Sequence, residues 1–113
     1  MESILTSIKK SIGIMPDYTI FDEDIIMYIN NALFNLTQIG VGPEEGFIIV
    51  DDQSKWSDFL GDSKKLEAAK TYVSIKTKLV FDPPVNTSHI ESLQRMADEC
   101  YNRLSYNVEP EEV

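Results

Sequence analysis

Several residue types on which functional sites depend are scarce in this 113-residue sequence, which contains one cysteine, one histidine and five glycines. A single cysteine excludes a disulfide within the chain and fits a reducing compartment. No apolar run approaches the roughly 20 residues needed to cross a bilayer, so we expect no contact with a membrane. Lys9 and Lys10 lie inside a helical pattern rather than ahead of an apolar stretch. We therefore expect no secretory signal peptide in this region.

Positive charge is also scarce. Ten Lys and Arg residues stand against 19 Asp and Glu, which gives a formal net charge of -9 and an isoelectric point near 4.4. This charge disfavours attraction to DNA phosphates or anionic lipid, so sequence-specific nucleic-acid binding is not expected. Residues 1–52 carry nine acids and two lysines, and residues 83–113 carry six acids and two arginines. Only residues 53–82, with six lysines and four acids, are locally basic.

No catalytic or cofactor motif is present. His89 falls in the first turn of a predicted helix, where the helix dipole disfavours protonation, so we expect an exposed structural residue. Cys100 lies on an apolar seam, where a free cysteine acts as a small hydrophobe. The acids Asp22, Glu23 and Asp24 precede a helix and lack the ligand pattern of a calcium loop. We therefore expect no enzyme activity, no cofactor and no metal.

Apolar residues recurring at three- and four-residue steps predict an all-α protein, a small bundle of four to five helices in a single domain. A short helix is expected over about residues 2–12, and longer helices over about residues 22–39, 63–81 and 88–106. We assign residues 1–106 to the domain and expect the acidic segment 107–113 to be a flexible tail.

The predicted helix ends rest on particular residues. Ser54 is expected to cap a one-turn helix that carries Trp56 and Phe59, two aromatic side chains expected in the core. Ser88 with Glu91 fits a capping box at the start of the last helix. That helix has a heptad-like apolar seam, which predicts lengthwise packing on another helix.

Between the second and third helices, residues 41–53 are expected to form one extended loop or a short hairpin. Its apolar residues Phe47, Ile48, Ile49 and Val50 are strand-like, but the rest of the chain supplies no strand to pair with them. Their backbone groups must therefore bond locally, to water or to another chain. A surface loop with four large apolar residues in a row is expected to be covered by a partner.

A series of short strings carries a resemblance to a known family. In chain order these are Ile26-Met27-Tyr28-Ile29-Asn30, Gln38-Ile39-Gly40-Val41-Gly42-Pro43, Trp56-Ser57-Asp58-Phe59-Leu60, Lys70-Thr71-Tyr72 and Phe81-Asp82-Pro83-Pro84. Their order and spacing resemble the small head-tail connector proteins of tailed phages and prophages, also called head-completion or adaptor proteins. The resemblance covers about residues 1–106. Where members of that family tend to end the last helix with Trp-Arg-Leu, this chain has Asn102-Arg103-Leu104.

The resemblance implies a structural role in the virion neck, after assembly in the host cytoplasm. Such proteins form a ring, commonly a dodecamer, beneath the portal protein, where the ring lengthens the DNA channel and docks a stopper or tail-completion protein. Because their C-terminal segment commonly reaches the portal, the resemblance gives residues 107–113, with Val108 and Val113, an expected role in that contact. Tyr106, just before this segment, is a further candidate for an oligomer or portal interface, although the aromatic contacts of the family's last helix cannot be carried over to it.

Charge adds two hypotheses to this implied role. A closed ring needs two different patches on each subunit, so we expect Lys64, Lys65 and Lys70 to contact the acidic N-terminal half of a neighbour. An acidic channel wall would let DNA slide past, whereas a basic wall would bind it.

Two other classes stay open at this point. One is an acidic inhibitor that imitates DNA, or another interaction module of phage origin, although lysines interrupt its acidic surface. The other is a helix-turn-helix DNA reader, which the overall charge disfavours.

Overall fold

Five helices and no strand are present in the computed structural model, which describes residues 2–61 and 63–106. The helices in chain order are α1 (Ile4–Ser11), α2 (Asp22–Gln38), α3 (Trp56–Leu60), α4 (Leu66–Phe81) and α5 (Thr87–Tyr106). The expected all-α bundle is therefore confirmed, with an extended loop rather than a hairpin between α2 and α3. The predicted tail, residues 107–113, lies outside the described residues.

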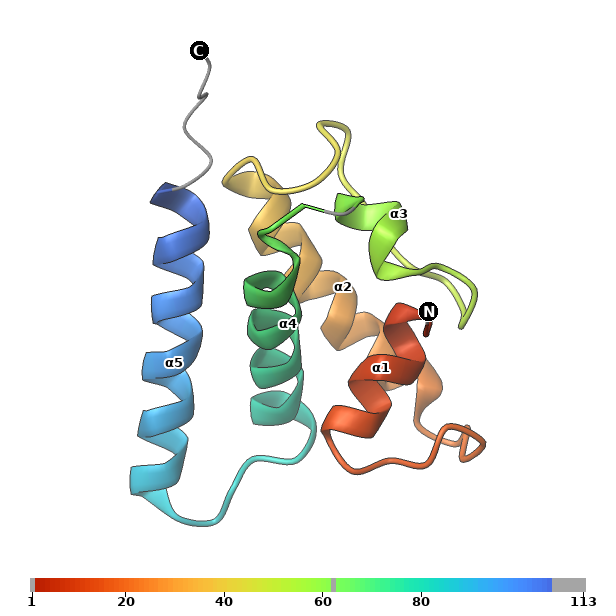
Figure 1. Cartoon of the computed structure of the whole chain (residues 1–113). Coiled ribbons are helices and arrows are strands. Elements are labelled where there is room, and N and C mark those ends of the chain that lie inside the picture. Colours follow the sequence, from red (N-terminus) through yellow and green to blue (C-terminus); the bar gives the residue numbers. More distant parts are fainter. Residues whose placement is uncertain (1, 62, 107–113) are drawn as a thin grey trace.

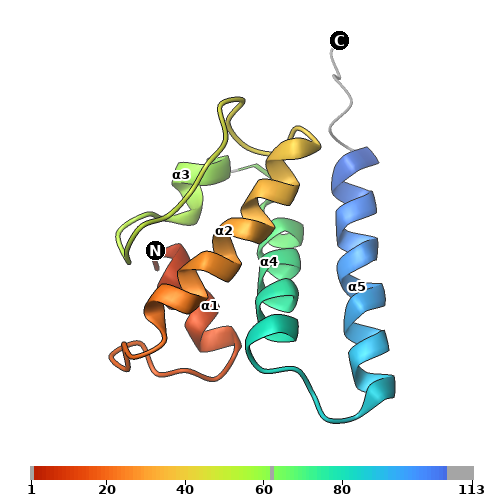
Figure 2. The same ribbon diagram turned by 180° about the vertical axis from the view of Figure 1, so that it is seen from behind.

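The central helix of the bundle is α4. It runs antiparallel to α5 on one side, while α2 crosses it on the other and α1 packs near its C-terminal half (Figures 1 and 2). Because α4 is covered from several directions, its buried residues are spread widely around the helix: Ala69, Tyr72, Val73, Ile75 and Thr77. The predicted seam of α5 is confirmed, since Ala97, Cys100 and Leu104 are buried in the same core.

Tyr72 joins the three long helices. Its hydroxyl accepts a hydrogen bond from the Asn35 side chain of α2 at 3.1 Å, and its ring lies 5.5 Å from that of Tyr101 on α5, measured between ring centres. Burial raises the pKa of the Tyr72 hydroxyl, although the Asn35 hydrogen bond acts in the opposite direction. A phenol held in this way fills the gap between helices without leaving its hydroxyl unpaired.

A buried ion pair ties α1 to the start of α2. The side chain of Lys9 is only 2% exposed; its Nζ lies 2.7 Å from the Asp22 carboxylate and donates to the Pro16 carbonyl oxygen at 2.9 Å. The neighbouring Lys10 instead pairs with Glu2 in solvent. Asp22, expected only as an acid at the start of a helix, thus has a specific partner in Lys9. No local pattern signals the pair, because its members lie 13 positions apart.

Two predicted caps are wrong. At α5 the side chain of Asn86, not Ser88, accepts from the backbone N–H of His89 at 3.1 Å. At α3 the first turn is closed by Asp58, whose carboxylate accepts from the Lys55 backbone N–H at 2.8 Å. Ser54 instead joins α1 to the segment before α3, because its carbonyl oxygen accepts a hydrogen bond from the Ile4 backbone N–H. In both cases a nearby residue, Asn86 two positions before Ser88 and Asp58 four positions after Ser54, supplies the capping oxygen.

Candidate functional site

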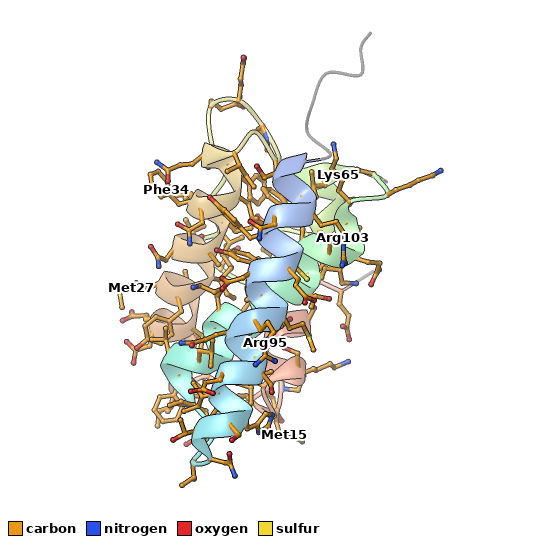
Figure 3. All side chains as sticks on the ribbon, turned by 90° about the vertical axis from the view of Figure 1, so that its left-hand side faces the viewer. Met15, Met27, Phe34, Lys65, Arg95 and Arg103 are labelled. Carbon is orange, nitrogen blue, oxygen red and sulfur yellow. The ribbon has the colours of Figure 1, made fainter. Side chains whose placement is uncertain are left out.

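The outward side of α2 carries exposed apolar residues. Met27, Asn31, Phe34 and Gln38 are all exposed and follow one another at steps of four, three and four residues, so they form a single row along the helix, here called the outer row. Met27 and Phe34 are 58% and 56% exposed. Figure 3 shows both side chains pointing away from the bundle. An exposed row in which two large apolar side chains alternate with amides is suited to contact with a partner helix or loop.

Two hollows lie beside the ends of the outer row. The first, the Phe34 hollow, has a volume of about 520 Å³ and lies between the C-terminal part of α2 and the loop, lined by Phe34, Thr37, Gln38 and residues 44–48. The second, the Met27 hollow, has a volume of about 560 Å³ and is lined by Met27, Tyr28, Asn30, Asn31 and Val80. Two glutamates, Glu44 and Glu45, contribute to the lining of the Phe34 hollow and give it acidic character.

The segment Phe47–Val50 is not the continuous apolar arm predicted from its sequence. Ile49 is 1% exposed, and both its backbone groups bond to the side chain of Asn30, at 2.8 Å and 2.9 Å. Phe47 is half-buried, with its ring 5.3 Å from that of Phe59. Only Ile48 and Val50 are exposed. The Asn30 side chain thus takes the place of the missing strand partner for Ile49. The sequence of the loop could not show this, because Asn30 lies in α2.

The predicted basic residues Lys64, Lys65 and Lys70 lie in the turn before α4 and on α4 itself. Lys64 is exposed, Lys65 is half-buried, and Lys70 lies 3.8 Å from Glu67 on its own helix. Figure 3 shows Lys65 and Arg103 on the side opposite to Met27 and Phe34. The structure therefore does not bring the predicted lysines and the Phe47–Val50 segment into one site. Val108, Val113 and the side chain of Tyr106 lie outside the described residues.

Charge is separated between these two sides. Residues 11–53, which include α2 and the loop that follows it, contain eight acids and no Lys, Arg or His. The lysines of α4 and the arginines of α5 come from the remainder of the chain. The α2 side of the protein thus combines acids with exposed apolar residues and has no basic residue, whereas the basic residues Lys65 and Arg103, interspersed with acids of α4 and α5, lie opposite to it (Figure 3).

The side chains weighed as catalytic candidates, His89 and Cys100, lie where each can serve as an ordinary surface or core residue. His89 is exposed in the first turn of α5, as predicted, and Cys100 is buried between α4 and α5. Burial raises the pKa of the Cys100 thiol, which opposes formation of the reactive thiolate. Within residues 2–61 and 63–106, no three His, Cys, Asp or Glu side chains are grouped so that they could hold a metal. In the same part of the chain, no helix is long and apolar enough to cross a membrane.

Comparison with known families gives a match over nearly the whole chain. Residues 4–111 match the family model described as "Phage connector protein". Comparisons with curated proteins and with solved structures found no match.

Proposed function

The chain belongs to the phage connector protein family, and on that premise we propose that it is a structural protein of the virion neck. In this proposal it assembles beneath the portal protein as a ring, a dodecamer as is common in such adaptors. The ring lengthens the DNA channel and joins the capsid to a stopper or tail-completion protein. Its role is to bind other proteins and involves no catalysis.

The observation that carries the proposal, together with family membership, is the presence of two unlike faces on one small domain. A subunit in a closed ring contacts two neighbours through different patches. Here an acidic face with exposed Met27 and Phe34 lies opposite a side with Lys65 and Arg103 (Figure 3). Such a subunit is suited to head-to-tail contacts with copies of itself.

The acidity of the chain fits a channel through which DNA must slide. Carboxylates repel phosphates, whereas a basic wall would hold them by releasing counterions. We therefore expect acids to dominate the bore of the ring. A ring whose bore is lined by Lys70 and Lys78 would contradict this part of the proposal.

Other predicted contacts extend the same proposal. Ile48, which lines the Phe34 hollow, and Val50 are both exposed, and we expect them to contact a neighbour or the portal. We expect the C-terminal segment with Val108 and Val113 to contact the portal, as in the related adaptors.

The decisive experiment is removal of the gene from the phage or prophage that encodes it. We expect heads that package DNA but carry no attached tails, and restoration of tails when the protein is supplied in trans. Cryo-electron microscopy of wild-type particles should then place the protein as a ring next to the portal. Normal tailed particles from the deletion strain would contradict the proposal.

A further inference from the structure

We infer that the outer row of α2 and the adjoining Phe34 hollow form the acceptor surface for a second copy of this chain. The donor surface, here called the basic face, is the side that carries Lys65 and Arg103, together with the exposed Lys64 next to Lys65 in the chain. This inference rests on the proposed ring and identifies the two surfaces that meet in it.

The acceptor surface has the composition of a specific protein interface. Its centre is apolar, with exposed Phe34 beside the half-buried Phe47 and exposed Ile48, and these three side chains help to line a single hollow. Glu44 and Glu45 contribute carboxylates to the same hollow. Interfaces commonly combine an aromatic anchor at the centre with charged groups at the rim, where charge selects the partner.

Charge decides which occupant fits. Because residues 11–53 contain no basic residue, the acceptor surface favours a partner with positive charge. Duplex DNA is repelled by Glu44 and Glu45. The chain's own segment 107–113 is excluded for the same reason, since it has three glutamates and no basic residue. The protein's own basic face has the required sign.

The positions of the two surfaces determine how copies would associate. Lys65 lies at the start of α4 and Arg103 near the end of α5, and these ends are adjacent because the two helices are antiparallel (Figure 1). In Figure 3 both residues lie opposite to Phe34. A copy bound at the acceptor surface therefore leaves its own acceptor surface open for the next copy. This head-to-tail contact can be repeated, as a ring requires, whereas a two-fold dimer would use one patch twice.

The first test removes the aromatic anchor. The full chain and its Phe34→Ser variant are compared by sedimentation velocity over a concentration series, both alone and with portal-bearing heads. We expect self-association to weaken about tenfold or more, as for truncation of a central anchor. Val85→Ser is the control, because Val85 is an exposed apolar residue that lines neither hollow. Circular dichroism checks that each variant is folded.

The second test exchanges charges. A variant with Glu44→Lys and Glu45→Lys has two basic faces, and one with Lys64→Glu and Lys65→Glu has two acidic faces. Each alone should associate more weakly than the wild type, because like charges then meet at every contact. An equimolar mixture should recover association, since each copy again meets an opposite charge. Recovery in the mixture would not follow if the substitutions merely damaged the fold.

The outcomes separate this inference from the proposed function. If the wild type forms rings and Phe34→Ser forms them equally well, or the charge mixture shows no recovery, the inference is wrong while the connector role stands. If the wild type self-associates neither alone nor on portal-bearing heads, both fail.

Discussion

The two sides of α2 differ in what their residues stabilise, although they belong to one helix. On the inner side Ile25, Ile29, Leu33 and Leu36 are fully buried against the rest of the bundle. On the outer side Met27 and Phe34 are more than half exposed. The hydrophobic effect therefore contributes to folding through the inner side and is available for association on the outer side. Substitutions on the two sides should thus affect different measurements.

The largest loss of stability is expected from a cavity on the inner side. Leu33→Ala removes a fully buried side chain and should lower the free energy of unfolding by about 3 kcal/mol. Urea denaturation followed by circular dichroism measures this change. A change below about 1 kcal/mol would show that the helices around Leu33 readily close the gap.

The next effect concerns the ion pair that attaches the start of α2 to α1. Lys9→Ala leaves Asp22 without its cation and the Pro16 carbonyl oxygen without its donor. Because the Asp22 side chain is 26% exposed, water offsets part of the loss. We expect Lys9→Ala to lower the free energy of unfolding by about 2 kcal/mol, which is less than the 3–5 kcal/mol typical of breaking a fully buried pair.

Lys10→Ala is the matched control for this variant, since its pair with Glu2 lies in solvent. An exposed pair contributes about 1 kcal/mol or less. Equal losses in Lys9→Ala and Lys10→Ala, measured by urea denaturation, would contradict the structural assignment.

An effect of similar size but more local is expected where α2 holds the loop. Asn30→Ala leaves both backbone groups of Ile49 without their partner and should cost about 1–3 kcal/mol. Hydrogen exchange at the Ile49 amide should accelerate strongly. Asn31→Ala is the control, because Asn31 is the exposed neighbour on the outer row. If exchange at Ile49 accelerates equally in both variants, Asn30 is not the anchor of the loop.

The pH dependence of Cys100 tests burial in the α4–α5 seam. Burial raises the pKa of its thiol in the folded protein, so the folded state holds its proton at pH values where the unfolded chain, with a pKa of about 8.5, loses it. Stability from this group is complete below that pH and falls as pH rises above it. Cys100→Ser should remove this part of the alkaline loss, as followed by thermal melts between pH 7 and 10. An unchanged pH profile would contradict the assignment.

The smallest effect on stability is expected on the outer row. Phe34→Ser should change the free energy of unfolding by no more than about 0.5 kcal/mol, because Phe34 is 56% exposed. The same variant is expected to weaken association. A large loss of stability in urea denaturation would place Phe34 in the fold rather than on a docking surface.

The long helices could be predicted from sequence because apolar residues at helical spacing report directly on the side of a helix that is buried. The α5 seam of Ala97, Cys100 and Leu104 is one example. The loop 41–53 was harder, since a run of four apolar residues does not show which of them face inward. The exposed row on α2 was also missed: Met27 and Phe34 lie out of phase with the buried stripe of that helix, but their spacing does not show that each of them borders a hollow.

The sequence by itself determined the all-α class, the acidity of residues 11–53 and the absence of recognisable catalytic motifs, because composition and periodicity are local properties. Tertiary structure alone decided that Lys9 meets Asp22, that Asn30 holds Ile49, and that Phe34 lies opposite Lys65 and Arg103. These relations join residues far apart in the chain, and they arise only when the helices pack. The faces through which such a protein meets its partners therefore cannot be identified from spacing alone.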